Sequence, residues 1–284
     1  MRPILKMSMT VAALCLAPAV PVLAAPAPVP PMTASDASAM QSALADPHRD
    51  ADRARDIWRH PAQTLAFFGV KPGMTVVDYL PSGGWYTRVL VPYLGPKGQY
   101  IGLNPGVADA SERTRQSMGN IAATFPPKAA AWTGVAADRI VAFNADAIPA
   151  ERKGTVDRVV IFREVHNMLS GGWLYPDLMA IRSLLKPDGM LGIVQHRAKA
   201  DAPADYANGS MGYLREKDVI SLVEALGFEL VGKSEINANP KDPANHPDGV
   251  WSLPPTYALG DKNRAAFAAI GESDRMTLLF RKRK

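Results

Sequence analysis

The chain has 284 residues, 47% of them hydrophobic and 21% charged, as is typical of a globular protein with a substantial core. This length suits one large domain of roughly 200–250 residues or two small ones. The formal charge of +5 is scattered, and only Arg281–Lys284 forms a basic run. Without a basic stripe that carries interleaved aromatic residues, the composition argues against a nucleic-acid partner.

Residues 1–25 are expected to be a secretory signal peptide. Arg2 and Lys6 form a positive start, residues 7–23 are uncharged and mostly apolar, and small residues stand at Ala24 and Ala25, where cleavage would occur. The apolar run is short for a membrane-spanning helix, although a retained anchor is the alternative. We therefore expect a periplasmic or secreted protein without stable membrane insertion after cleavage.

The segment after the expected cleavage point is rich in Ala, Pro and Ser. Residues 26–47 are interpreted as a flexible leader with at most a weak helical turn. The only cysteine, Cys15, lies within the expected signal, so the mature chain would have no disulfide. Residues 48–284 are then the folded domain.

From residue 48 onward, helix-like and strand-like segments alternate. The helix-like segments are 50–60, Pro61–Phe68, Trp85–Leu94, Asp109–Phe125, Tyr175–Leu185 and Glu216–Leu226. The strand-like segments are Met74–Leu80, Gln99–Leu103, Arg139–Phe143, Val156–Phe162, Met190–Gln195, Phe228–Ser234 and Met276–Arg281. This alternation predicts an α/β fold with a largely parallel sheet that is covered by helices on both faces.

The stretch VVDYLPSGGWYT (76–87) has the outline of a strand, a turn and a helix. Gly83 and Gly84 would let the backbone approach a ligand, and the helix start offers free N–H groups and a positive dipole end. Asp78, at the strand end, could accept hydrogen bonds from a ligand or brace the loop. Ligands of such sheets bind beyond the carboxyl ends of the strands. An ordinary strand-to-helix turn is the competing interpretation.

Several further segments resemble class I S-adenosylmethionine-dependent methyltransferases, over about residues 60–235. They are GQYIGL (98–103), FNADAIP (143–149), VDRVVIFREVHNML (156–169), LLKPDGMLGIVQHR (184–197) and LVEALGFELV (222–231). PSGGWYT, FREVHN, QHRA and GESDRM look more narrowly like a bacterial group of predicted secreted methyltransferases. The resemblance implies a Rossmann-like fold with a mostly parallel seven-stranded sheet, and S-adenosylmethionine (SAM) as cofactor.

The resemblance also assigns cofactor-binding positions, with departures from the family pattern. Asp78, Ser82, Gly83 and Gly84 fall on the loop, but Leu80 and Ser82 stand where the family has glycines. The second strand is followed by Asn104, where the family usually has an acid for the ribose hydroxyls. Asp146 would lie near the adenine, or else be a solvated loop acid.

Polar residues follow the fourth strand in FREVHN. His166 could accept a proton from a hydroxyl or amine acceptor, and Arg163 could anchor an anionic substrate or pair with a carboxylate. His166 could instead only brace the strand end. His196 would face the same site, but no metal-ligand spacing accompanies the two histidines, and no metal is expected.

Residues 237–260 form a long Pro-rich insertion, which is interpreted as a lid or binding loop. The expected function is methyl transfer from SAM to a small-molecule acceptor. The alternatives are an exported ligand-binding module that has the fold without the transfer, and a hydrolase or lyase that uses the same cleft. No Gly-x-Ser-x-Gly elbow supports a hydrolase. Oligomeric state and acceptor do not follow from the sequence.

Overall fold

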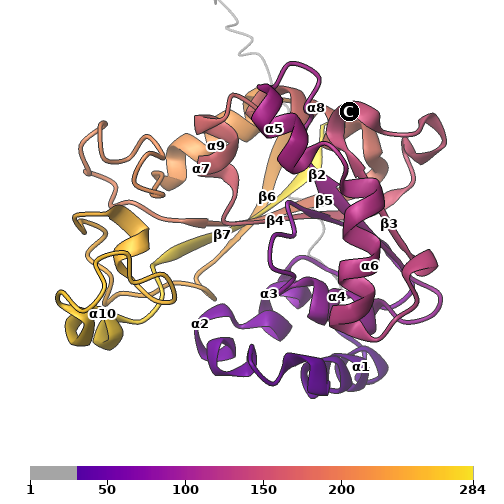
Figure 1. Cartoon of the computed structure of the whole chain (residues 1–284), viewed down its shortest axis with the longest axis horizontal. Coiled ribbons are helices and arrows are strands. Elements are labelled where there is room, and N and C mark those ends of the chain that lie inside the picture. The colour runs from indigo at the N-terminus through magenta and orange to yellow at the C-terminus, as the bar shows by residue number, and fades with distance from the viewer. Residues whose placement is uncertain (1–30, 284) are drawn as a thin grey trace, which may run out of the picture.

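The structure is a computed structural model that describes residues 31–283. Its centre is a seven-stranded sheet in the order β3-β2-β1-β4-β5-β7-β6, in which only β7 runs antiparallel to its neighbours (Figure 1). The strands are β1 (Thr75–Tyr79), β2 (Gln99–Asn104), β3 (Ile140–Asn144), β4 (Val156–Phe162), β5 (Leu185–His196), β6 (Phe228–Ser234) and β7 (Arg275–Lys282). The predicted Rossmann-like, mostly parallel seven-stranded fold is confirmed.

Ten α-helices in the described residues accompany the sheet. They are α1 (Ala34–Leu44), α2 (Asp56–Arg59), α3 (Pro61–Phe67), α4 (Thr87–Leu94), α5 (Glu112–Met118), α6 (Ile121–Thr133), α7 (Val165–Ser170), α8 (Leu174–Leu184), α9 (Glu216–Ala225) and α10 (Arg264–Ile270). None of these helices has the length and apolar character needed to cross a membrane.

The alternation of side chains along the strands divides the core into two layers. Val77 and Ile161 face one layer, which α7, α8 and α9 cover. Val76 and Val160 face the other, which α1, α3, α4 and α6 cover. The middle parts of these strands are mostly apolar, as expected for parallel strands that are covered on both faces. Asp78, near the end of β1, is the one buried acid within the described strands.

The expected leader differs from the structure where the two can be compared. Residues 34–44 form helix α1, which Thr33 and Asp36 begin with a reciprocal capping box. Met40 and Ala43 are buried against the core layer that includes α4. The expected signal peptide and cleavage point lie outside the described residues.

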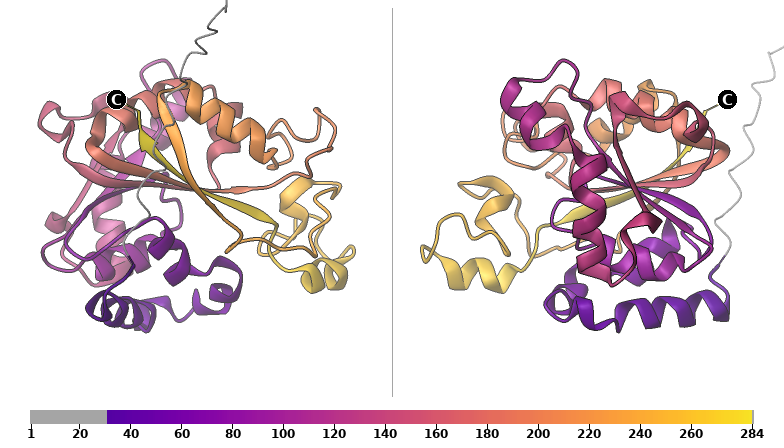
Figure 2. Two further views of the ribbon diagram at one scale, coloured as in Figure 1. Left: turned by 180° about the vertical axis from the view of Figure 1, so that it is seen from behind. Right: turned by 45° about the vertical axis from the view of Figure 1, so that its right-hand side comes forward.

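Two further differences concern helices. The helix expected over 109–125 is divided into α5 and α6 at Gly119, and α6 continues to Thr133 through Pro126 and Pro127. The insertion at 237–260 and α10 form a lobe at one end of the sheet (Figure 2). Asp242, which is fully buried, accepts hydrogen bonds from Tyr213, His246 and the backbone of Ala244 and Asp274, and so fixes this lobe to the domain.

Candidate functional site

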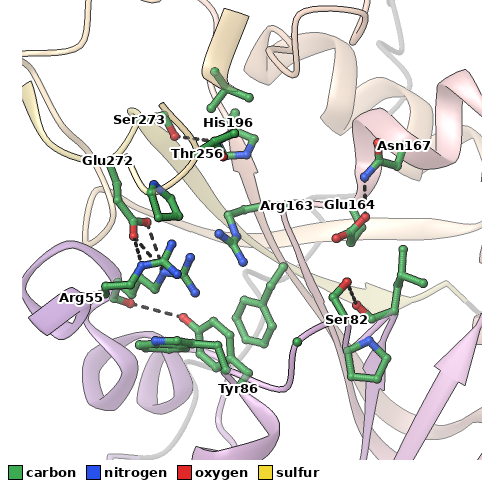
Figure 3. Close-up of a pocket in the computed structure, with 18 of the residues that line it drawn as sticks. Arg55, Ser82, Tyr86, Arg163, Glu164, Asn167, His196, Thr256, Glu272 and Ser273 are labelled. Carbon is green, nitrogen blue, oxygen red and sulfur yellow. Dashed lines mark hydrogen bonds and ion pairs between the residues drawn. The ribbon is translucent and has the colours of Figure 1, made fainter. Parts of the chain in front are cut away.

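A cavity of about 360 Å³ lies at the carboxyl ends of β1 and β4 (Figure 3). The loop after β1 and the residues after β4 form its floor, and His196 borders it from the end of β5. Because β7 is antiparallel, the residues just before its start, Glu272 and Ser273, also reach this edge. Residues 52–59 and the insertion close the remaining sides, so the cavity lies where α/β sheets place their ligands.

The backbone around this cavity is strained. Of the seven non-glycine residues with positive φ in the described chain, three border the cavity: Leu80 (49°), Ser82 (48°) and Arg163 (64°). Left-handed backbone at non-glycine residues costs about 1–3 kcal/mol and clusters at ligand sites. Leu80 and Ser82 are the two positions where the resembled family has glycine. The loop therefore keeps a glycine-type backbone without the glycines, and Leu80 packs partly against the core.

The two glycines of the loop have different roles. Gly83 borders the cavity, and a Cβ atom added to it would meet nothing within 4 Å. Gly84 has φ of 74°, and an added Cβ would overlap the ring of Trp132. The close approach at Gly84 is therefore to Trp132, and the structure does not place Gly84 among the cavity residues.

Asp78 is buried at the end of β1 and borders the cavity. Its Oδ2 accepts a hydrogen bond of 2.9 Å from the Tyr100 hydroxyl. Burial raises the pKa of Asp78 to about 7, against the opposing effect of hydrogen bonds from Tyr100 and Thr87. This carboxyl group braces β1 against β2 and α4 while it remains at the cavity wall.

Glu164 and Asn167 form a pair that the sequence analysis did not select. Asn167 Nδ2 donates a hydrogen bond of 2.6 Å to Glu164 Oε2 at the start of α7. Burial raises the pKa of Glu164 to about 7, although Asn167 and Arg163 favour its charged form. Both residues border the cavity, so Glu164 is a carboxyl group that changes charge near neutral pH at the site. The sequence signal for Glu164 was its position directly after Arg163 in FREVHN, at the end of the fourth strand.

His166 is buried beside the cavity, and its ring lies 5.9 Å from that of Trp251 and 5.6 Å from that of His196. Gln195 Nε2 donates to the Gly212 carbonyl at 2.8 Å and lies 3.3 Å from His166 Nδ1. One hydrogen of the Gln195 amide is donated to Gly212, and the other is directed at His166 Nδ1. Nδ1 is therefore the acceptor, and the neutral imidazole carries its proton on Nε2. Burial lowers the pKa of His166 to about 4. His166 is therefore a neutral hydrogen-bond donor, and the expectation that it removes a proton near neutral pH is not supported by this geometry.

Asn104 and Asp146 do not border this cavity. Asn104 Nδ2 donates to the Met118 carbonyl at 3.4 Å. Asp146 borders a separate hollow beside Gly106, and its carboxylate accepts hydrogen bonds from the N–H groups of Val107 and Ala108 at 2.7 and 2.6 Å. Sequence position placed both residues after the correct strands, but their polar atoms are engaged within the chain.

A cluster of arginines around Glu272 forms the side of the cavity opposite the β1 loop. Glu272 pairs with Arg55 at 2.6 Å, with Arg59 at 3.1 Å and with Arg275 at 3.1 Å. Burial alone would raise the pKa of Glu272, but Arg275, Arg59 and Arg55 outweigh it and lower that pKa to about 2. These ion pairs connect the run GESDRM (271–276) to the N-terminal segment.

The residues present fit one half of SAM better than the other. Gly83 and Ser82 leave open space before α4, which would hold the amino-acid end of the cofactor. The positions implied for the ribose and adenine are less suited, because Asn104 and Asp146 already make hydrogen bonds within the chain. Within residues 31–283, no cluster of His, Cys, Asp and Glu could hold a metal ion.

No protein-family model matches the chain, and no curated protein matches it. The chain is similar to the solved structure of a putative sarcosine dimethylglycine methyltransferase from Galdieria sulphuraria, with a TM-score of 0.51 and 14% identity over 84% of this chain and 91% of that one. It is also similar to a SAM-dependent methyltransferase from Aquifex aeolicus, with a TM-score of 0.47 and 19% identity over 71% and 93%. A third similar structure is a geranyl diphosphate methyltransferase in complex with SAM. Its TM-score is 0.47, with 14% identity over 85% of this chain and 94% of that one. At such identities the likeness shows the fold alone.

Proposed function

We propose that the protein is a SAM-dependent methyltransferase with a small-molecule acceptor. The observation that carries this proposal is the strained, glycine-type loop at the carboxyl end of β1, which borders the cavity between β1 and β4. The fold supports it, since the solved structures named above share this architecture. Bound SAM would supply a methyl group on a sulfonium.

The residues of the cavity suit a direct displacement. Such a reaction depends mainly on alignment, and proton removal from a hydroxyl or amine acceptor is an added requirement. Glu164 is the group for that removal, because it borders the cavity and Asn167 holds only one of its oxygens. The Nε2–H of His166 serves as a hydrogen-bond donor that orients the acceptor.

The second candidate is an exported ligand-binding module without methyl transfer. Asn104 and Asp146 favour it, because both are used within the chain at the positions where the resembled family binds the nucleoside. Both candidates share the proposal of export, which rests on the basic and apolar character of residues 1–25.

Isothermal titration with SAM and with S-adenosylhomocysteine separates the two candidates. We expect both compounds to bind the wild-type protein. The Ser82→Gly variant should bind within about 1 kcal/mol of the wild type, since it removes one neutral hydroxyl. Absence of binding to a folded wild-type sample would reject methyl transfer and leave the binding module.

A further inference from the structure

The arginines of the cavity outnumber the carboxylates that pair with them. Arg55, Arg59 and Arg275 share the single carboxylate of Glu272. Arg88 is satisfied separately, because its guanidinium makes hydrogen bonds of 2.5 and 2.9 Å to Asp52. The Glu272 cluster therefore carries an excess of positive charge.

Arg163 adds another cation beside this cluster. It follows β4, and no side chain in residues 31–283 forms an ion pair or hydrogen bond with its guanidinium, which extends into the cavity (Figure 3). Burial lowers the pKa of Arg163; Glu272 opposes this effect, and Arg275 and Arg55 add to it. An arginine nevertheless stays charged at neutral pH. The cavity thus holds a partly buried cation that makes no direct ion pair with any described residue, although Glu272 and Glu164 border the same cavity.

Two more donors of the same cluster lack partners. Arg55 Nη2 and Arg59 Nη1 are buried, and neither has a hydrogen-bond acceptor in the described chain. Unpaired buried donors cost about 1–3 kcal/mol each, and more when they are charged. Arg55, Arg59 and Arg163 all border one cavity, so the charge of all three would favour an anion bound there.

The walls near the arginines are aromatic. The rings of Tyr86 and Phe162 stack with centroids 3.4 Å apart, and Trp251 borders the cavity from the insertion. Figure 3 shows Arg55 and Glu272 on one side of the cavity, Ser82 and Glu164 on the other, and Arg163 between them. An anionic group at the arginines would thus leave the rest of a ligand directed toward Glu164 and the β1 loop.

We propose that the methyl acceptor carries a carboxylate or phosphate group, which binds Arg55, Arg59 and Arg163, and an apolar body that contacts the aromatic walls. That the bound molecule is the methyl acceptor rests on the proposed function. The anion site itself does not rest on it. Arginine suits it because its planar donors match the oxygens of both groups. The alternative source of the same chemistry is the carboxylate of SAM itself.

The test compares benzoate with benzamide, which has the same shape without the charge, and adds phenyl phosphate. Calorimetry on the S-adenosylhomocysteine-loaded protein should show at least about tenfold tighter binding of an anion than of benzamide, with loss of that preference at high salt. Arg163→Met should abolish the preference and Arg163→Lys should restore part of it. Arg281→Met, which removes a surface pair with Glu229 at the far end of β7, is the matched control.

Three outcomes decide the inference. Equal binding of benzoate and benzamide, no binding of either anion, or an unchanged preference in Arg163→Met would each overturn it. If Arg163→Met does not fold, Arg55→Met serves in its place, because Glu272 would still pair with Arg59 and Arg275. A large loss of SAM affinity in Arg163→Met, with competition between benzoate and SAM, would assign the site to the cofactor's carboxylate. If wild-type protein binds neither SAM nor S-adenosylhomocysteine, methyl transfer is rejected, and the same comparison of benzoate with benzamide on the unloaded protein still tests the anion site.

Discussion

At the scale of single residues, the adjacent glycines Gly83 and Gly84 have different roles: Gly83 leaves space for a ligand, and Gly84 leaves space for the packing of Trp132. A branched side chain at Gly83 would extend into open space at the cavity, whereas any side chain at Gly84 would overlap Trp132 at a backbone that disfavours one.

We expect Gly83→Val to weaken SAM binding by at least about tenfold while thermal stability changes little. Gly84→Ala should instead lower stability by about 1–3 kcal/mol, because Trp132 must move and φ is positive. Melting temperature and calorimetry on both variants measure the two effects. A Gly83→Val protein that binds SAM like the wild type would contradict the assignment of this loop.

Glu164 predicts the pH dependence of the proposed reaction. Because burial raises its pKa to about 7, the ionised form that can accept a proton is lost as pH falls below that value. With a hydroxyl or amine acceptor, kcat should rise with pH through about 7. Glu164→Gln should lower kcat by about 10²–10⁴-fold and remove this limb of the profile. A Glu164→Gln enzyme with an unchanged pH profile would exclude Glu164 as the base.

At the scale of elements, Glu272 joins the start of β7 to the N-terminal segment through Arg55 and Arg59. Removing its charge would leave two buried arginines, Arg59 and Arg275, without an anion. We expect Glu272→Gln to destabilise the protein by about 3–5 kcal/mol in urea denaturation at neutral pH. The control variant Glu229→Gln, which removes the more exposed ion pair with Arg281, should change stability by less than about 1 kcal/mol.

The pKa of Glu272 also fixes the sign of its effect on acid stability. Its folded pKa of about 2 is lower than its ordinary value of 4.5, so its contribution is present above pH 4.5. That contribution is lost as pH falls from about 4.5 to about 2. The difference in unfolding free energy between wild type and Glu272→Gln should shrink over this window; a constant difference would show that Glu272 is not the group involved.

The strands were predictable from the sequence, and several helices were not. Apolar runs such as VDRVVIF identify buried strands without reference to their neighbours. Helix α6 contains Pro126 and Pro127, which argue locally against a helix although packing against β2 and β3 stabilises it. Helix α1 was missed because its Ala-rich sequence resembles a spacer, yet the Thr33–Asp36 capping box was a readable signal.

The candidate site could be predicted only in part. Five predicted residues border one cavity because each lies at or just after a strand end at the same edge of the sheet: Asp78, Ser82, Gly83, Arg163 and His166. The cluster around Glu272 could not be derived, since it joins residues 213 and 217 positions apart through side chains alone. Likewise, the tautomer of His166 depends on Gln195 and Gly212, which no local pattern connects to it.

The insertion gives a test of the expected lid. Trp251 borders the cavity, but Asp242 in the same segment is buried in a hydrogen-bond network, so deletion of 241–252 would unfold the lobe. Trp251→Ala is the sharper change: we expect weaker binding of the acceptor with little loss of SAM affinity. Separate titrations measure both, and equal weakening of the two ligands would assign Trp251 to general packing.

At the scale of the whole molecule, the expected export makes a prediction about the mature chain. Cleavage near Ala24 or Ala25 would remove Arg2 and Lys6, and would leave helix α1 with its Thr33 cap complete. N-terminal sequencing of protein from a cell fraction should begin close to Ala25 or Pro26. An intact Met1 on soluble cytoplasmic protein would contradict export.

The antiparallel direction of β7 has a consequence for when the protein can first bind a ligand. Because β7 begins at the cavity, Glu272 leaves the ribosome 217 and 213 residues after its partners Arg55 and Arg59. Chains fold from the N-terminus during synthesis, but this cavity stays incomplete until the start of β7 has been synthesised. A nascent chain held unfolded for secretion would therefore pass through the cytoplasm, with its pool of ligands, before it has a site to bind them.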